Sequence, residues 1–538
     1  MKIPTLMAGF ATALLLVAGT VTVQAHDDDV TEGKGQLGRV KFANSCDPKV
    51  QVQVERGVAM LHSFWESATE ATFRHVLEHD PKCAIANWAI ASILMNNPLA
   101  GIGASPKSAE KAQAAIDAGR QIGAGTQRER DYIEAVAAYY QDFGNRSERS
   151  RQESRSKAYD ALAARYPDDD EAQIFAALYL AATQLQSDQT YSAYLKAAGV
   201  LEKQFVKYPD HPGVAHYLIH SYDAPPIAKQ GLVAARLYAA IAPAAPHALH
   251  MPSHIFTRVG AWEESAATNG RAAEVAVKGN EPDQAYHAAD YSVYAYLQLA
   301  RDADARRAMD SAMKVTGANP AQATAPYAVA AMQARLALER GAWREAMELP
   351  APAQLSRFPW TDAITYFARG LGAVRAGDVS AAEKSGEQLA AIHKALLDAK
   401  NNYWATEVEV QRLSLAGWIA WAKSQPEDAL KFMRAAADLE DKNEKHIVTP
   451  GRMVPARELL GDLLMELKQP AQALKEYELS QVREPNRFRG IYGAARAAEA
   501  AGDRQKAATS YAQLLALAKN ADSQRPELIA AKAYTAAR

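Results

Sequence analysis

The chain has 538 residues, of which 49% are hydrophobic and 23% charged, and its formal net charge is −2. Such a length exceeds what one hydrophobic core serves and indicates several domains or a repeat array. The balanced charge excludes the strongly basic class of nucleic-acid-binding proteins. Apolar content rich in alanine, without long Val/Ile/Thr alternation, favours an all-α protein.

The first residues are typical of a secretory signal. Lys2 precedes an uncharged stretch over residues 3–23, and small residues lead to an acidic run after Ala25. We predict a signal peptide over residues 1–25 and therefore a periplasmic or secreted protein. Because the stretch is long enough to span a bilayer, an uncleaved anchor is the alternative. No second apolar segment of that length follows, so we expect no membrane span in the mature form.

Two cysteines, Cys46 and Cys83, each adjoin an Asp-Pro-Lys triplet. In an exported protein they could form one disulfide near the N-terminal end of the helical array. Two separate buried thiols are the alternative, because a sequence does not supply the Cα distance that a disulfide requires.

The C-terminal end contains the clearest repeat. Ala473, Tyr477 and Pro485 form a pattern whose first two members return 34 residues later as Ala507 and Tyr511. Small residues let two helices approach closely, the aromatic ring fills the space between hairpins, and proline ends a helix. The pattern resembles the tetratricopeptide repeat consensus. That resemblance implies an all-α, right-handed solenoid of stacked helical hairpins with a concave groove.

Weaker copies of the repeat extend the resemblance over about residues 50–535. Turn and helix-start motifs of the same kind recur at Gly260-Ala261-Trp262 and Gly341-Ala342-Trp343. After the signal peptide we expect an N-terminal extension over 26–45, N-terminal repeats over 46–165, central repeats over 166–348 and C-terminal repeats over 349–538.

Histidines concentrate in the central repeats, where seven of the chain's 13 lie between His211 and His287. His216 and His220 are spaced i, i+4, and so are His250 and His254, which places each pair on one helix face. The pairs are 34 residues apart, the length of one tetratricopeptide unit. They are therefore expected at equivalent positions of consecutive repeats.

The resemblance also implies which of these side chains face the concave groove. Helical angles place the histidines away from the apolar face, which disfavours a role as ordinary core residues. A polar groove wall without special chemistry and a site for a ligand both stay open. The predicted ligand-binding groove consists of His216, His220, Asp223, His247, His250, His254, Arg258, His287 and Asp290.

A divalent transition metal is the ligand that the histidine pairs favour. Imidazoles at i, i+4 can share one ion, and packed helices are close enough for two pairs to converge on a single ion or to hold two. Imidazole with carboxylate suits Zn, Cu, Fe or Ni, and Asp223 or Asp290 could coordinate or orient the rings. Pro252 is expected to kink the helix between the members of one pair. The predicted metal ligands are His216, His220, His250 and His254.

The predicted function is an exported scaffold that binds a protein or peptide partner in its groove. A metal-binding protein or a metal-dependent enzyme is the alternative, and an anionic ligand beside Arg258 is a further use of the same stripe. No phosphate loop, nucleophile elbow, HExxH or separate acid–base pair occurs in the sequence, which favours binding over catalysis.

Overall fold

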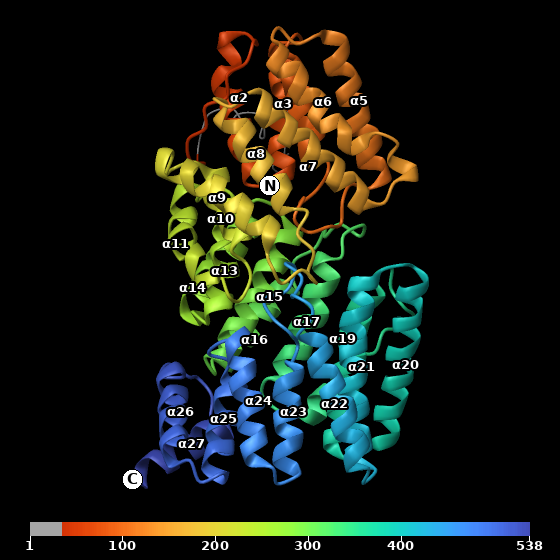
Figure 1. Cartoon of the computed structure of the whole chain (residues 1–538), viewed down its shortest axis with the longest axis vertical. Coiled ribbons are helices and arrows are strands. Elements are labelled where there is room, and N and C mark those ends of the chain that lie inside the picture. The colour runs from red at the N-terminus through yellow and green to blue at the C-terminus, as the bar shows by residue number, and fades with distance from the viewer. Residues whose placement is uncertain (1–34, 538) are drawn as a thin grey trace, which may run out of the picture. The chain divides into compact units, whose positions relative to one another are not determined.

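The computed structural model describes residues 35–537, and within that range the chain consists of helices and loops (Figure 1). The predicted signal peptide and the first part of the predicted extension lie outside the described residues. From Gly35 onward the chain forms one compact unit. Among residues 35–537, no helix is both long and apolar enough to cross a membrane. The predicted all-α class is confirmed.

Helices follow one another along the whole unit, most of them joined by short connections. Those before the histidine pairs are η1 (Pro48–Val50), α2 (Gln51–His62), α3 (Glu66–His79), α4 (Ala84–Ile93), α5 (Pro106–Ile122), α6 (Gln127–Tyr140), η2 (Phe143–Asn145), α7 (Glu148–Arg165), α8 (Asp170–Ala181) and α9 (Ser192–Lys207). Those of the middle are α10 (Pro212–Ser221), η3 (Ala228–Gly231), α11 (Leu232–Ile241), α12 (Pro246–His250), α13 (Pro252–Val259), α14 (Trp262–Lys278), α15 (Pro282–Gln298), α16 (Asp302–Ala312) and α17 (Thr324–Leu338). The remainder are α18 (Trp343–Met347), α19 (Pro359–Ala376), α20 (Val379–Asp398), α21 (Asn402–Ala422), α22 (Pro426–Glu440), α23 (Ala456–Glu466), α24 (Pro470–Arg483), α25 (Phe488–Ala500), α26 (Arg504–Leu517) and α27 (Pro526–Ala536).

The helices pair into hairpins that stack on their chain neighbours, as the repeat pattern predicts. Helices α24 and α26 begin 34 residues apart and bury their equivalent rings, Tyr477 and Tyr511. Gly461 and Gly493 lie against the Tyr477 ring so closely that an added Cβ would be 2.7 Å and 2.3 Å from it. Small residues are thus required where the aromatic ring fills the space between hairpins. The predicted fold class, a solenoid of stacked helical hairpins, is confirmed.

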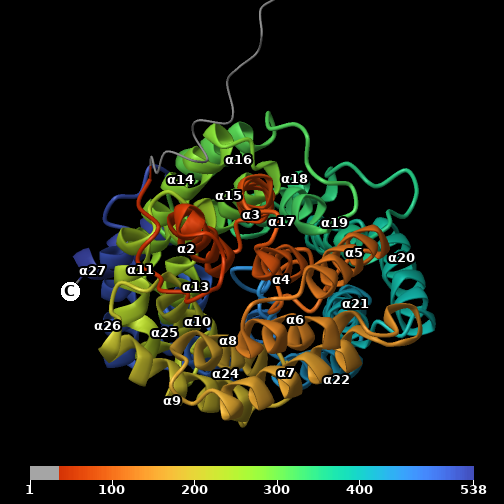
Figure 2. The same ribbon diagram turned by 90° about the horizontal axis from the view of Figure 1, so that it is seen from above.

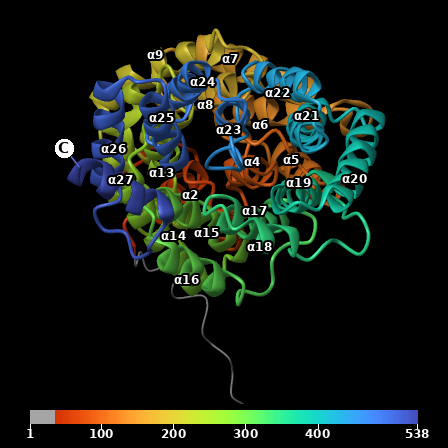
Figure 3. The ribbon, with the colours of Figure 1, turned by 90° about the horizontal axis from the view of Figure 1, so that it is seen from below.

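Helices that are far apart in the sequence also meet. Helix α15 contacts α25, and Trp262 Nε1 donates a hydrogen bond of 2.7 Å to the carbonyl oxygen of Asn486. Views from above and below show the segment before α23 projecting among the surrounding helices (Figures 2 and 3). This cover segment, residues 441–455, receives contacts from early repeats: the Glu444 amide donates to Gln186 O, and His446 bonds to Ala100 O. The solenoid therefore closes on itself in its middle.

A disulfide joins Cys46 to Cys83, 37 residues further along the chain. Cys46 precedes η1, and the buried Cys83 stands directly before α4. The bond ties the beginning of the helical array to its second hairpin.

Candidate metal centre

Six histidines from consecutive central helices converge in the interior. Helix α10 carries His216 and His220, helices α12 and α13 carry His247, His250 and His254, and α15 carries His287. The first five are 0–6% exposed and His287 is half-buried. The resemblance implies an open groove at these positions, and this expectation is wrong, since the cover segment and the Phe64 ring close over them.

The first group, triad A, consists of His216, His220 and His247. Their ligand nitrogens all lie within 4.8 Å of one another. His216 Nδ1 donates a hydrogen bond of 2.6 Å to the carbonyl oxygen of His62, so its Nε2 carries the lone pair. Among residues 35–537, neither His216 Nε2 nor His220 Nε2 has a hydrogen-bond partner. Buried nitrogens without partners are rare, and here they belong to a set of rings with metal-ligand spacing.

The second group, triad B, consists of His250, His254 and His287, and its ligand nitrogens meet the same 4.8 Å limit. His250 Nδ1 lies 2.7 Å from the side-chain oxygen of Asn269, whose amide nitrogen donates to Ser265 O. His254 Nδ1 lies 2.9 Å from an Asp223 oxygen. Both Nδ1 atoms therefore carry the proton, and the two bare Nε2 atoms lie 3.0 Å apart.

Triads A and B lie next to each other. The ring centroids of His220 and His254 are 5.5 Å apart, and those of His247 and His250 are 5.9 Å apart. The pair spacing allows either one ion shared by both pairs or two ions. The structure places the four histidines in two triads and adds His247 and His287. The division arises because the members of an i, i+4 pair stay together while the neighbouring helix supplies the third ring.

Pro252 breaks the helix as predicted, yet the pair survives. Helix α12 ends at His250, and α13 begins at Pro252. Met251 between them keeps helical angles, φ −52° and ψ −38°. The two rings therefore still lie on one side of the backbone.

Asp223 organises triad B from outside. Besides His254, it accepts a hydrogen bond of 2.8 Å from Arg258 Nε and lies 3.7 Å from Lys445 Nζ. Burial alone would raise the pKa of Asp223, but Lys445 and Arg258 hold it well below its usual range. The carboxylate is therefore ionised, and it orients the His254 ring and fixes its tautomer.

Two residues of the predicted groove have other roles. The repeat phase predicts Asp290 in the histidine stripe, but the structure pairs it with the buried Arg335 of α17. The buried guanidinium needs a counter-charge, which explains why Asp290 pairs with Arg335 and not with the histidines. Arg258, the predicted anion-binding residue, is already engaged by Asp223 and Glu444.

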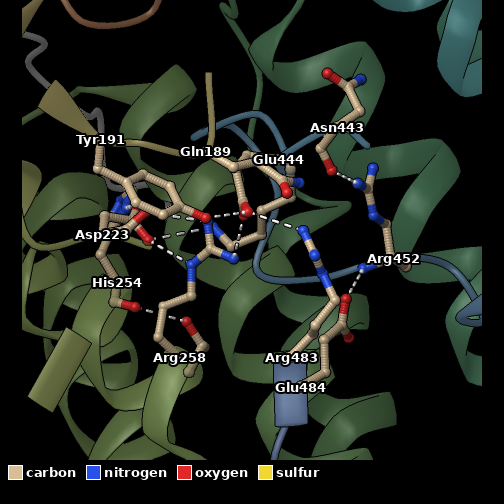
Figure 4. Close-up of polar contacts among 12 residues, drawn as sticks. Gln189, Tyr191, Asp223, His254, Arg258, Asn443, Glu444, Arg452, Arg483 and Glu484 are labelled. Atoms are coloured by element: carbon tan, nitrogen blue, oxygen red, sulfur yellow. Dashed lines mark hydrogen bonds and ion pairs between the residues drawn. The ribbon is translucent and has the colours of Figure 1, made fainter. Parts of the chain in front are cut away.

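The cover segment is anchored mainly through Glu444 (Figure 4). Its carboxylate accepts hydrogen bonds from Tyr191 at 2.8 Å, Arg483 at 2.9 Å and Arg258 at 3.3 Å. The Tyr291 hydroxyl, on the histidine-bearing α15, donates to Ile447 O at 2.9 Å. One buried carboxylate thus joins early, central and late repeats above the histidines.

Lys445 is a buried cation next to the centre. Burial lowers its pKa to about 8, although Asp223 opposes the shift. Its charge in turn contributes, after burial, to lowering the pKa of His220 and His287. The centre therefore includes an amine that no residue pattern indicated.

A hydrogen-bonded group behind triad A was also missed from the sequence. His62 bonds through Nε2 to Glu171 at 2.9 Å and through Nδ1 to the Tyr217 hydroxyl at 2.9 Å. His211 bonds to the other Glu171 oxygen at 2.8 Å. This network holds His62 in place, and the backbone carbonyl of His62 accepts the hydrogen bond from His216 Nδ1. His62 lies more than 100 residues before the other members, and the group follows no repeat period, so no signal in the sequence marks it.

Comparison with known proteins adds little to this description. No family model matches the chain, and no curated protein matches it. Among solved structures, yeast Tom70 is 13% identical with a TM-score of 0.30, covering 90% of this chain and 88% of that one. The Cut9–Hcn1 hetero-tetramer of the APC/C gives 12% identity and a TM-score of 0.29, with 90% and 96% covered. At these values the likeness to the tetratricopeptide family rests on the chain's own repeated hairpins.

Proposed function

We propose that this protein binds two late transition-metal ions, one on triad A and one on triad B. The His250–His254 contact carries the proposal, because two lone pairs point at each other across 3.0 Å. Burial lowers the pKa of both rings, which disfavours a shared proton at neutral pH. A cation between the nitrogens removes the repulsion, and a tetrahedral zinc ion holds its nitrogens about 3.3 Å apart.

The chemistry of the six side chains supports this class of ion. Each triad offers three imidazoles and no thiolate or carboxylate, a set that suits Zn, Cu, Ni or Fe better than Ca or Mg. The outer partners also fit, since metal-binding histidines commonly donate their other N–H to a carbonyl or carboxylate. His216, His250 and His254 each do so, to His62 O, Asn269 and Asp223 respectively.

The proposal is tested by metal analysis of the full-length protein without a histidine tag. After incubation with Zn²⁺ and dialysis, we expect two ions per chain, one after His250→Ala/His254→Ala and one after His216→Ala/His220→Ala. His75 and His79 on α3 have the same spacing but lie at the surface, half-buried and exposed respectively, and their alanine variant should retain two. Wild-type protein without stoichiometric metal would overturn the proposal, as would histidine variants that still hold two ions.

A metal-dependent enzyme is the second candidate, favoured by the number of ligands. Structural zinc sites are closed by four protein ligands, whereas catalytic sites keep three and leave one position open. Each triad supplies three. We propose that the open positions take water or a small anion, tested by azide titration of the Co²⁺-loaded protein, whose absorption bands should shift.

Binding of a protein or peptide partner stays a prediction. The stripe that the resemblance assigns to such a partner is covered by residues 441–455, so a partner would have to use another face. Export to the periplasm or outside the cell also stays a prediction, tested by N-terminal sequencing of the mature protein.

A further inference from the structure

An acidic cavity of about 390 Å³ lies between the solvent and triad A. The first turns of α3 and α15 contribute Glu66 and Asp283, and their neighbourhoods add Glu70 and Glu281. His247 lines the inner wall, and it is the one member of the six histidines that does so among the described residues. We call this cavity the vestibule.

The vestibule has an excess of negative charge. No lysine or arginine belongs to its described lining. Arg74 pairs with Glu70, and Lys111 lies near Glu66, but neither basic residue reaches the lining. Partial burial together with the charges of Glu70 and Glu281 raises the pKa of Glu66, and burial raises that of Asp283. The acids therefore lie close enough to repel one another, which a cation would relieve.

His247 connects the acids to the metal centre. It is 6% exposed, and within residues 35–537 neither of its ring nitrogens makes a hydrogen bond of normal geometry, although the Gln284 side chain, also in the lining, is a polar neighbour of the ring. The same ring belongs to triad A and packs 5.7 Å from Phe64, which also lines the vestibule. A cation held by the acids thus has a buried, unpaired imidazole as its next ligand.

We propose that the vestibule is the route by which a hydrated divalent metal ion reaches the histidines. The inference rests on the proposed metal function. Carboxylates at the mouth attract the ion and raise its local concentration, as charged clefts do for their ligands. His247 then replaces a water molecule of the ion, and the remaining histidines complete its coordination. The acids speed the passage without belonging to the final ligand set.

Stopped-flow binding of Co²⁺ to the metal-free, full-length protein tests the route. In Glu66→Gln/Asp283→Asn we expect association about three to ten times slower at low salt, and nearly wild-type rates at high salt. Dissociation should slow by a similar factor, so affinity and the two-ion stoichiometry stay close to wild type. Glu427→Gln/Asp428→Asn is the matched control, because it removes the same charge from the exposed first turn of α22.

A steric block gives an independent readout. Among residues 35–537 no cysteine is free, so Gln322→Cys in the vestibule lining introduces a single thiol. A bulky maleimide there should slow Co²⁺ association at every salt concentration, while the same label on Val482→Cys, at a site 74% exposed on α24, should not. Unchanged association in both the charge variant and the blocked protein would overturn the route. Faster Co²⁺ dissociation and weaker affinity in the charge variant would also overturn the route, because they would show that the acids are ligands of the bound ion. Wild-type protein that binds no Co²⁺ would instead refute the metal function itself.

Discussion

His216 Nδ1 donates a hydrogen bond of 2.6 Å to the carbonyl oxygen of His62, which lies 154 residues earlier in the chain. The position of that oxygen depends on the His62 side chain, which is held by Glu171 and Tyr217. His216, a proposed ligand in triad A, is thus oriented by a network that begins in helix α2.

Replacing the acceptor of this network should weaken triad A without removing a ligand. In Glu171→Gln we expect about tenfold lower Co²⁺ affinity at triad A and an unchanged triad B, since outer partners of metal ligands are typically worth that much. The measurement is a Co²⁺ titration followed by absorbance. Asp170→Asn, which alters the adjacent carboxylate bound to Lys207, should leave both affinities intact. Equal affinity in wild type and Glu171→Gln would show that the network does not orient His216.

Asp223 should be the most sensitive residue of triad B. Asp223→Asn removes the carboxylate that Lys445 pairs with and leaves Arg258 paired with Glu444 alone, and we expect a loss of about 3–5 kcal/mol in stability. The tautomer of His254 is freed as well, so triad B should lose its ion on dialysis. Chemical denaturation and metal analysis measure the two effects. Asp310→Asn on the exposed side of α16 is the control, and a stable Asp223→Asn protein with two ions would contradict the assignment.

Acid should destabilise the metal-free protein. Burial lowers the pKa of His247 to about 3, and those of His216 and His220 fall well below 6.5. The unfolded chain takes up these protons near pH 6.5 while the folded chain does not, so stability is complete above pH 6.5 and falls below it. His247 alone should cost about 2 kcal/mol at pH 5.

Thermal melts between pH 7.5 and pH 5 in EDTA measure this dependence. His247→Gln should flatten it, whereas His393→Gln, far from the centre in sequence, should not. Because metals bind neutral imidazole and the buried rings stay neutral in the folded protein, the stabilisation by added Zn²⁺ should persist at pH 5. A melting temperature independent of pH would refute the buried neutral histidines.

Glu444 should control how tightly the cover segment closes. Glu444→Gln removes the charge that Arg258 and Arg483 face. We expect faster amide hydrogen exchange over residues 441–449 and several-fold faster metal release. The reason is that local opening of the cover segment has to break these ion pairs, and a neutral side chain makes that opening easier. Exchange mass spectrometry and chelator competition report the two effects. Glu427→Gln is the control, and unaltered exchange would mean that the apolar contacts of the segment suffice.

Reduction of the Cys46–Cys83 bond should lower stability but leave the metal centre assembled. Closing a loop of this length restricts the unfolded chain by about 3–4 kcal/mol. Cys46→Ser/Cys83→Ser is therefore expected to unfold at a lower urea concentration and still bind two ions. Loss of metal in that variant would assign the disulfide a direct role in shaping the site.

The spacing of residues in the sequence predicted those parts of the site in which both side chains belong to one helix. His216 with His220 and His250 with His254 were found because i, i+4 neighbours share a face wherever the helix lies, and the 34-residue offset put them in adjacent hairpins. Asp290 was misplaced because its partner, Arg335, belongs to a different helix. His62, Glu171 and Lys445 were missed because their approach depends on how the hairpins curve over hundreds of residues, which no local pattern encodes.

The cover segment has a consequence for the repeats themselves. In an open array each unit contacts only its neighbours, so units can be gained or lost by duplication. Here residues 441–455 must return to Asp223, just after α10, and to helices α13 and α15. Inserting or deleting a single hairpin between α15 and α23 would carry the segment past the histidines and leave them open to water. The number of repeats between α15 and α23 is therefore constrained, because the chain between them must have the length that places residues 441–455 over the histidines.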